Sequence, residues 1–158
     1  MHTTELNATP DSELNATELN ATATTFEETV QARVKLALNS SPGRSASERR
    51  RSRRHPYPYP VQLTPVTSDG EVLTGDTFFV LGKHLGEGGL DFYHSDPVPY
   101  RRAIASLKCG DQWVSLLMDL TWCRFGVHSW YENGGRFINA VLSPLDPDAP
   151  TDLRALMV

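Results

Sequence analysis

The sequence predicts an all-β fold: a small six-stranded antiparallel β-barrel, preceded by a disordered tail and a short helix. Three observations indicate it. From residue 57 onward, apolar and polar residues alternate with the period of a strand, turn-forming residues recur at short spacings, and no long helical pattern lies between the strands. Strands this short and numerous favour a closed barrel, because closure removes exposed sheet edges. The 158 residues suit one such domain with additional chain in front of it.

Residues 1–23 are predicted to be a disordered repeat tail. The pentapeptide Glu-Leu-Asn-Ala-Thr occurs three times there, beginning at Glu5, Glu13 and Glu18. One leucine in five residues buries too little apolar surface to offset the conformational entropy lost on ordering the chain.

Residues 24–39 are predicted to form a short amphipathic helix. Thr24 or Thr25 can cap its N-terminus, with a glutamate three residues later. Apolar residues then recur at helical spacing and share one face, which either packs on the body of the protein or binds a partner. These apolar positions are Phe26, Val30, Val34, Ala37 and Leu38.

The formal net charge of -4 conceals a local concentration of arginine. Residues 44–54 contain six arginines opposed only by Glu48, whereas residues 1–30 contain six acidic residues and no lysine or arginine. We interpret residues 40–55 as a polar linker that ends in this arginine cluster. A solvated charge run and a patch for nuclear import or nucleic-acid binding are the other interpretations.

Residues 56–143 are predicted to form the barrel. Prolines at positions 56, 58, 60 and 65 confine its first strand to an edge or to an irregular entry into the barrel. Residues 132–135 are expected to form a turn, and residues 144–158 a Pro- and Asp-rich tail with one helical turn after Thr151. The expected strands cover residues 57–64, 77–83, 90–94, 101–107, 113–125 and 136–142. On the strand 113–125, the residues expected to share one face are Val114, Leu116, Met118, Leu120 and Trp122.

Two motifs, taken in their order along the chain, indicate a resemblance to a known family. An arginine cluster precedes the first strand, and a glycine-rich turn at residues 84–89 connects two later strands. This combination resembles the PilZ domain, a β-barrel family that binds the bacterial second messenger cyclic di-GMP, over roughly residues 49–142. The first motif of the family, Arg-x-x-x-Arg, is matched by Arg50 and Arg54, and Arg49 and Arg53 form a second register.

The second motif of the family, Asp/Asn-x-Ser-x-x-Gly, aligns with residues 84–89. Here His84 replaces the acid or amide, Gly86 replaces the serine, and Gly89 matches. In the family, the acid or amide and the serine help to hold a guanine base. His84 can still offer a hydrogen bond, and Glu87 is a candidate acceptor for guanine. The resemblance therefore implies a ligand site made of Arg50, Arg54, His84, Gly86, Glu87 and Gly89.

These residue types suit such a ligand on physical grounds. Arginine makes forked, charge-assisted hydrogen bonds to phosphate, reads the O6 and N7 atoms of guanine together, and stacks on bases. The glycines at positions 86, 88 and 89 let a ligand approach the backbone closely, or they only form a tight turn that needs positive φ.

The sequence contains no motif for catalysis and no spacing typical of metal ligands, so we expect a protein that is not an enzyme and uses no metal or cofactor. No apolar run reaches the ~18 residues of a membrane span, and the N-terminus lacks the pattern of a secretory signal. We therefore expect a cytoplasmic protein with no membrane partner.

The expected function is that of a non-enzymatic sensor or effector module that binds cyclic di-GMP. The alternative is a degenerate PilZ-like adaptor that binds a protein partner and not the nucleotide. Nucleic-acid binding through the arginine cluster ranks behind both.

Overall fold

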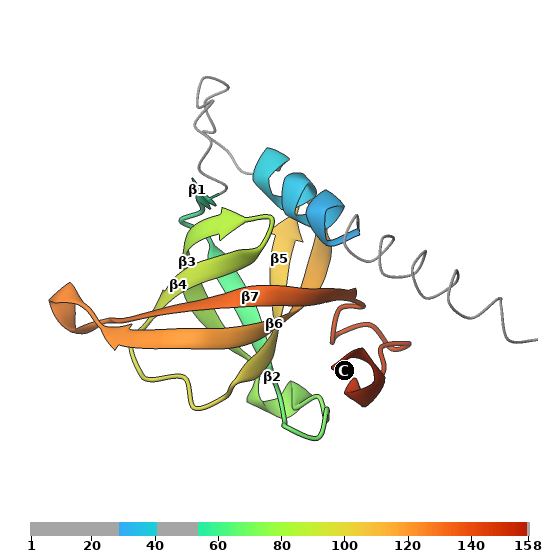
Figure 1. Ribbon diagram of the computed structural model, residues 1–158. Helices are drawn as coiled ribbons and strands as arrows, with labels where there is room; N and C mark the ends of the chain where they lie inside the picture. Colours follow the sequence, from blue (N-terminus) through green and yellow to red (C-terminus); the bar gives the residue numbers. More distant parts are fainter. Residues whose placement is uncertain (1–28, 41–53, 158) are drawn as a thin grey trace, which may run out of the picture.

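The computed structural model describes residues 29–40 and 54–157 (Figure 1). In this part of the chain, a short helix at residues 29–39 precedes seven strands and three single turns of 3₁₀ helix. The predicted tail at residues 1–23 lies outside the described residues, as does most of the predicted linker. The strands are β1 (Arg54–Pro56), β2 (Pro60–Val66), β3 (Phe78–Gly86), β4 (Gly89–His94), β5 (Arg102–Cys109), β6 (Gln112–Phe125) and β7 (Tyr131–Val141); the turns are η1 (Thr74–Asp76), η2 (Val127–Ser129) and η3 (Arg154–Leu156).

Six of these strands close a barrel. They follow the order β3-β2-β5-β6-β7-β4, every neighbouring pair is antiparallel, and β4 returns to pair with β3. The strand β1 lies outside this ring and pairs with β3 alone. The prediction of an all-β fold with a six-stranded antiparallel barrel behind a short helix is thus confirmed.

The strand β3 shares one of its edges between two partners. Phe78–Leu81 pair with β2, and His84–Gly86 pair with β1 on the same edge, since β4 occupies the other. Gly82 lies at the change of partner, where a Cβ atom would overlap the carbonyl oxygen of Tyr57. The predicted first strand at 57–64 is therefore wrong at its start, because residues 57–59 belong to no strand and the chain turns inward at Tyr57, which is buried. The strand that follows, β2, lies between β3 and β5, so its predicted place at an edge is wrong as well.

The barrel interior is filled by apolar side chains that alternate along the strands. Val114, Leu116 and Met118 of β6 point into it, as the alternation predicts. A register shift between Leu120 and Trp122 then interrupts the alternation. Leu120 still packs on the core, whereas Trp122 is 37% exposed, so the predicted common face for these two residues is wrong.

The predicted turn at residues 132–135 is also wrong, because these residues lie inside β7. The actual turn between β6 and β7 comes earlier, at η2, and the two strands form a long hairpin that extends past the barrel (Figure 1). The two glycines of this segment instead allow neighbouring groups to pack closely against the backbone of β7. A Cβ atom on Gly134 would overlap the indole of Trp122, and one on Gly135 would overlap the carbonyl of Asp119.

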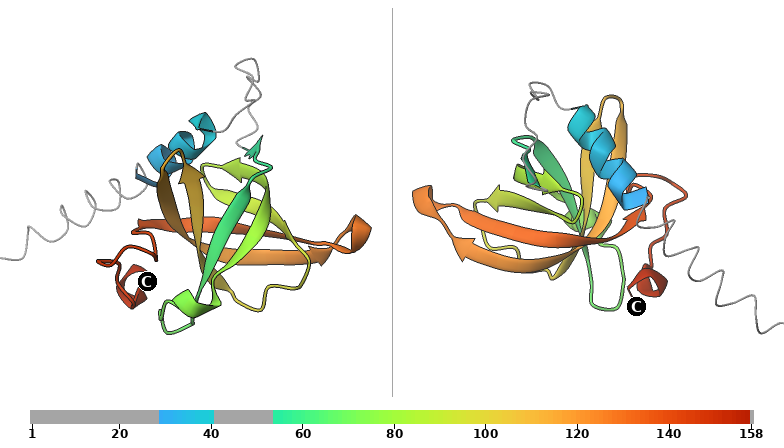
Figure 2. Two further views of the ribbon diagram at one scale, coloured as in Figure 1. Left: turned by 180° about the vertical axis from the view of Figure 1, so that it is seen from behind. Right: turned by 45° about the horizontal axis from the view of Figure 1, so that its top comes forward.

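The helix at residues 29–39 covers one end of the barrel beside the hairpin of β5 and β6 (Figure 2). The guanidinium of Arg33 donates hydrogen bonds to the carbonyls of Ser115 and Val141, which form the last pair of the β6–β7 ladder. Partial burial lowers the pKa of Arg33. The buried residues of the helix, Val30, Val34, Ala37 and Leu38, belong to the main core.

The C-terminal segment covers a second apolar surface on the outside of the barrel. Leu153 packs there with Ile104 and Leu117, two residues whose side chains point away from the interior. The single helical turn expected after Thr151 is present as η3. Among the described residues, no helix has the length and apolar character needed to cross a membrane.

Replacing Val34 by alanine tests whether the helix folds as part of the barrel. Val34 is fully buried in the main core, so Val34→Ala is expected to lower the free energy of unfolding by about 2 kcal/mol. The matched control is Leu36→Ala, since Leu36 is 46% exposed and its loss is expected to cost less than about 0.5 kcal/mol. Urea unfolding measures both, and equal effects would show that the helix does not depend on the barrel.

Candidate functional site

The outside strand β1 brings the two sequence motifs together. Arg54 pairs with Gly86, and Pro56 pairs with His84, so the end of the arginine cluster runs alongside the glycine-rich hairpin. Gly86 pairs with Gly89 across a two-residue turn. The last arginine of the first motif and the first residue of the second are therefore close in space because of backbone pairing.

A pocket of about 410 Å³ lies on the outer side of the barrel at this point. One cross-strand row forms its centre: His84 on β3 pairs with Asp91 on β4, Asp91 pairs with Gly134 on β7, and Gly134 pairs with Trp122 on β6. Since Gly134 has no side chain, the row is open between Asp91 and Trp122. The complete lining is Arg54, Lys83, His84, Asp91, Trp122 and Arg124.

Asp91 holds the first cation of the pocket. Its carboxylate accepts a hydrogen bond from the guanidinium of Arg54 at 2.7 Å, and the Nδ1 atom of His84 lies 3.7 Å from the same oxygen. The side chain of Asp91 is almost completely buried, whereas that of Arg54 is largely exposed. The charge-assisted hydrogen bond to Asp91 therefore holds Arg54 at the pocket.

Glu132 on β7 holds the other two cations. Its carboxylate accepts hydrogen bonds from Lys83 at 3.1 Å and from the Nε atom of Arg124 at 2.7 Å. The bond from Arg124, and then the one from Lys83, lower the pKa of Glu132, and the bond from Glu132 raises the pKa of Lys83. Three cations against two carboxylates leave this region with one net positive charge when His84 is neutral.

Trp122 supplies the aromatic surface of the pocket. Its indole packs on the backbone of Gly134, and the guanidinium of Arg124 lies 5.7 Å from the ring centroid. From the sequence, this tryptophan is expected to be a packing or rim residue. The register shift before it, which turns it outward, has no clear signature in the sequence.

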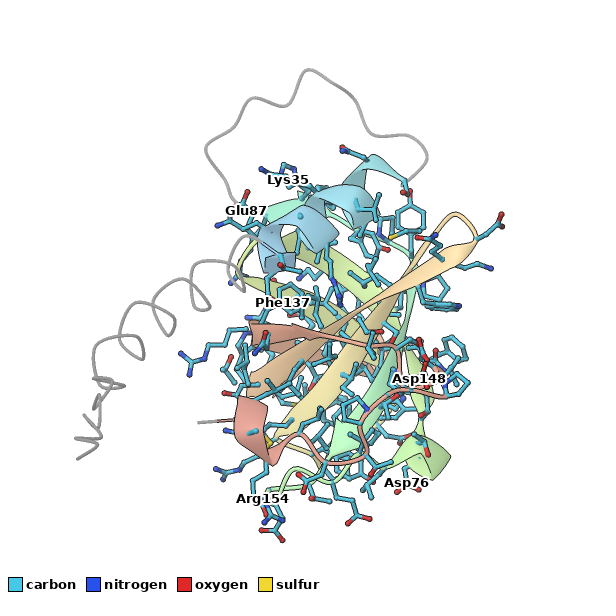
Figure 3. All side chains as sticks on the ribbon, turned by 90° about the vertical axis from the view of Figure 1, so that its right-hand side faces the viewer. Lys35, Asp76, Glu87, Phe137, Asp148 and Arg154 are labelled. Carbon is cyan, nitrogen blue, oxygen red and sulfur yellow. The ribbon has the colours of Figure 1, made fainter. Side chains whose placement is uncertain are left out.

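The structure places the predicted site residues as follows. Arg54 and His84 line the pocket, and Gly86 lies opposite Arg54 in the β1–β3 ladder. Glu87 is exposed at the hairpin turn, at the same end of the molecule as Lys35 of the helix, and does not line the pocket (Figure 3). Arg49, Arg50 and Arg53 lie outside the described residues.

The three glycines of the hairpin do not use left-handed backbone conformations. In the described residues, the glycines with positive φ are Gly70 and Gly110. Gly89 is needed for a different reason, since its Cβ atom would overlap the carbonyl oxygen of Gly135 on β7, whereas a Cβ atom on Gly88 would meet nothing within 4 Å. The match of Gly89 to the family motif thus has a packing explanation in this chain.

Sequence reasoning missed Lys83, Asp91, Trp122, Arg124 and Glu132 as members of the site. These residues lie on four different strands, and the register in which the strands pair brings them together. One signal was present: two adjacent glycines at 134–135 inside a strand indicate that another group approaches the backbone there. Among residues 29–40 and 54–157, no group of three His, Cys, Asp or Glu side chains is arranged to hold a metal ion.

Substituting the two hairpin glycines separately tests the packing explanation. Gly89→Ala is expected to lower the free energy of unfolding by about 1–3 kcal/mol, because β4 and β7 must move apart. Gly88→Ala is the control and is expected to change stability by less than about 1 kcal/mol. Thermal or urea unfolding gives both values; similar losses in the two variants would contradict the packing role of Gly89.

The ion pairs of Glu132 predict a pH dependence of stability. Because the folded-state pKa of Glu132 is lowered, its contribution is complete above the ordinary glutamate pKa and is lost as the pH falls through the lowered value. Wild type is expected to exceed Glu132→Gln in unfolding free energy by about 1 kcal/mol at neutral pH, with the difference shrinking in acid. A difference that is constant with pH, measured by urea unfolding, would contradict this assignment.

Comparisons with known proteins add no match to these observations. No family model, no curated protein and no solved structure matches the sequence. The chemistry of the pocket therefore decides which function the chain supports.

Proposed function

We propose that the protein is a non-enzymatic, cytoplasmic sensor module that binds cyclic di-GMP in the pocket between β1, β3, β4 and β6. One observation carries the proposal. The pairing of β1 with β3 places Arg54, the second arginine of the Arg-x-x-x-Arg motif, against the His84–Gly89 hairpin and at the edge of a cationic pocket. The two halves of the family resemblance thus meet in space, although they are thirty residues apart in sequence.

The charges of the pocket suit the phosphates of a cyclic dinucleotide. The ligand is a dianion, and the side chains of Arg54 and Arg124 are both largely exposed while each forms an ion pair with a carboxylate. Arginine suits a phosphate because its guanidinium has five N–H donors in a planar fork and makes charge-assisted hydrogen bonds to phosphate oxygens. Lys83 adds a third positive charge beside them.

The aromatic and polar groups suit the guanine bases. Trp122 offers a partly exposed indole face, and stacking of a base on an aromatic side chain contributes about 1–3 kcal/mol. Asp91 and His84 lie across the open floor at Gly134, and a carboxylate can accept hydrogen bonds from the N1 and N2 atoms of guanine. In this proposal Asp91 takes the acceptor role that the sequence suggested for Glu87, because Glu87 does not line the pocket.

The remaining arginines of the cluster complete the site. Arg50 precedes Arg54 by four residues, and Arg49 and Arg53 provide the second register. All three precede β1 directly in sequence, so their distance from the pocket is limited by a few residues of chain. In the proposed complex, Arg50 contacts the ligand together with Arg54.

The alternative function is that of an adaptor that binds a protein partner and not the nucleotide. Two observations favour it. Gly86 stands where the family has a serine, so one hydrogen bond to guanine is missing, and Asp91 competes with the ligand for Arg54.

Isothermal titration calorimetry with cyclic di-GMP tests the proposal. Wild type is expected to bind saturably, and Arg54→Ala is expected to weaken binding about 10- to 100-fold through loss of charge-assisted hydrogen bonds. Arg50→Ala and Trp122→Ala are expected to weaken binding as well. Arg154→Ala is the matched control, because Arg154 is an exposed arginine on the C-terminal segment, away from the pocket, and its loss is expected to leave affinity unchanged.

Absence of heat with folded wild type would contradict the nucleotide proposal and favour the adaptor. Binding to generic duplex DNA with a steep dependence on salt, and none to the dinucleotide, would indicate nucleic-acid binding by the arginine cluster instead. Equal losses in Arg54→Ala and Arg154→Ala would show that binding depends on overall charge and not on this pocket.

A further inference from the structure

The hairpin of β6 and β7 leaves one edge of β6 unpaired within the part of the chain that the structure describes. The ladder between β5 and β6 ends at Asp119, whereas the ladder between β6 and β7 continues on the other side to Phe125. Figures 1 and 2 show this hairpin extending clear of the barrel. Residues 121–125 therefore present backbone N–H and C=O groups along a free edge, which is a template for pairing with another strand.

The side chains of this segment are unusually apolar for a free edge. All five residues are exposed, and Phe125 is 65% exposed. The tip of the hairpin continues the apolar surface, with Val127 81% exposed and Trp130 also exposed. Soluble proteins commonly protect such edges with charges, prolines or covering segments, and Arg124 is the only charged residue here. An unprotected apolar edge indicates a binding partner.

We propose that this partner is a second copy of the chain, paired antiparallel along residues 121–125 with Cys123 on the two-fold axis. An antiparallel pair of identical edges is self-complementary, and it closes as a two-fold dimer. In this register Thr121 faces Phe125 of the second copy, Trp122 faces Arg124, and Cys123 faces Cys123.

The side-chain pairs of this register are compatible. No two like charges are opposed, since the one charged residue, Arg124, faces Trp122 of the other copy. Arg124 and Trp122 already contact each other within one chain, so their contact between chains has the same chemistry. On the other face, aromatic and hydroxyl side chains meet around the two cysteines.

A cavity at the end of the free edge adds a second complementary feature. A pocket of about 620 Å³ is lined by residues that include Tyr100, Asp119, Leu120 and Thr121. In the antiparallel register, the hairpin tip that follows Phe125 of one copy and includes Val127 runs toward Thr121 of the other copy, which lines this pocket. In the dimer, the apolar hairpin tip of each copy thus lies near the pocket of the other copy. The interface therefore buries more surface than the pairing of five strand residues would bury alone.

Crosslinking of the full-length chain tests the position of the axis. Diamide takes two electrons and two protons from a pair of thiols and joins their sulfur atoms, so it is expected to convert wild type into a covalent dimer. Cys123 is exposed and Cys109 is buried. Cys123→Ser is therefore expected to remain uncrosslinked while it still dimerises reversibly.

Sedimentation equilibrium over a wide range of protein concentration tests the interface itself. Wild type and Cys123→Ser are expected to reach the mass of two chains, whereas Cys123→Lys, which opposes two ammonium groups at the axis, is expected to raise the dissociation constant of the dimer about fivefold or more. Circular dichroism confirms that each variant is folded. Wild type that remains a monomer without a crosslink would overturn the proposal, as would a dimer that Cys123→Lys does not weaken.

Discussion

The backbone ladder between β1 and the end of β3 is the constraint on which the site depends. It fixes Arg54 opposite Gly86 and Pro56 opposite His84. The ladder exists because β2 leaves the edge of β3 at Leu81, and because Gly82 has no side chain to block the carbonyl of Tyr57 as the chain turns inward. A residue with a Cβ atom at Gly82 would move Tyr57 and, with it, the strand that carries the arginine.

The electrostatics of the pocket follow from where the register puts two carboxylates. Asp91 forms an ion pair with Arg54, and Glu132 forms ion pairs with Lys83 and Arg124, so these three cations are positioned before anything binds. Preorganisation of this kind reduces the side-chain entropy that binding must overcome. It also gives selectivity, because a ligand must offer negative charge in the right places to compete with the carboxylates for the same donors.

The sequence was sufficient to predict the barrel and the short helix in front of it, because hydrophobic alternation and helical spacing are local properties. The proximity of Arg54 to His84 was implied by the family resemblance and not by these local patterns. It was insufficient for Trp122, since one register shift after Leu120 reverses the face of every later residue on β6. Lys83 and Arg124 look like ordinary solvent-facing charges until the register brings both to Glu132. The length of the β6–β7 hairpin was missed for a related reason, since the glycines at 134 and 135 are also typical of a turn.

Nuclear magnetic resonance of the tryptophan indole N–H groups tests the central claim most directly. The chain has three tryptophans, and only Trp122 lines the pocket, whereas Trp113 lies on β6 near the β5–β6 turn and Trp130 lies at the tip of the β6–β7 hairpin. Titration with cyclic di-GMP is predicted to shift the indole signal of Trp122 saturably and to leave that of Trp113 in place. An unchanged Trp122 signal at saturating ligand would contradict the assignment of this pocket as the binding site.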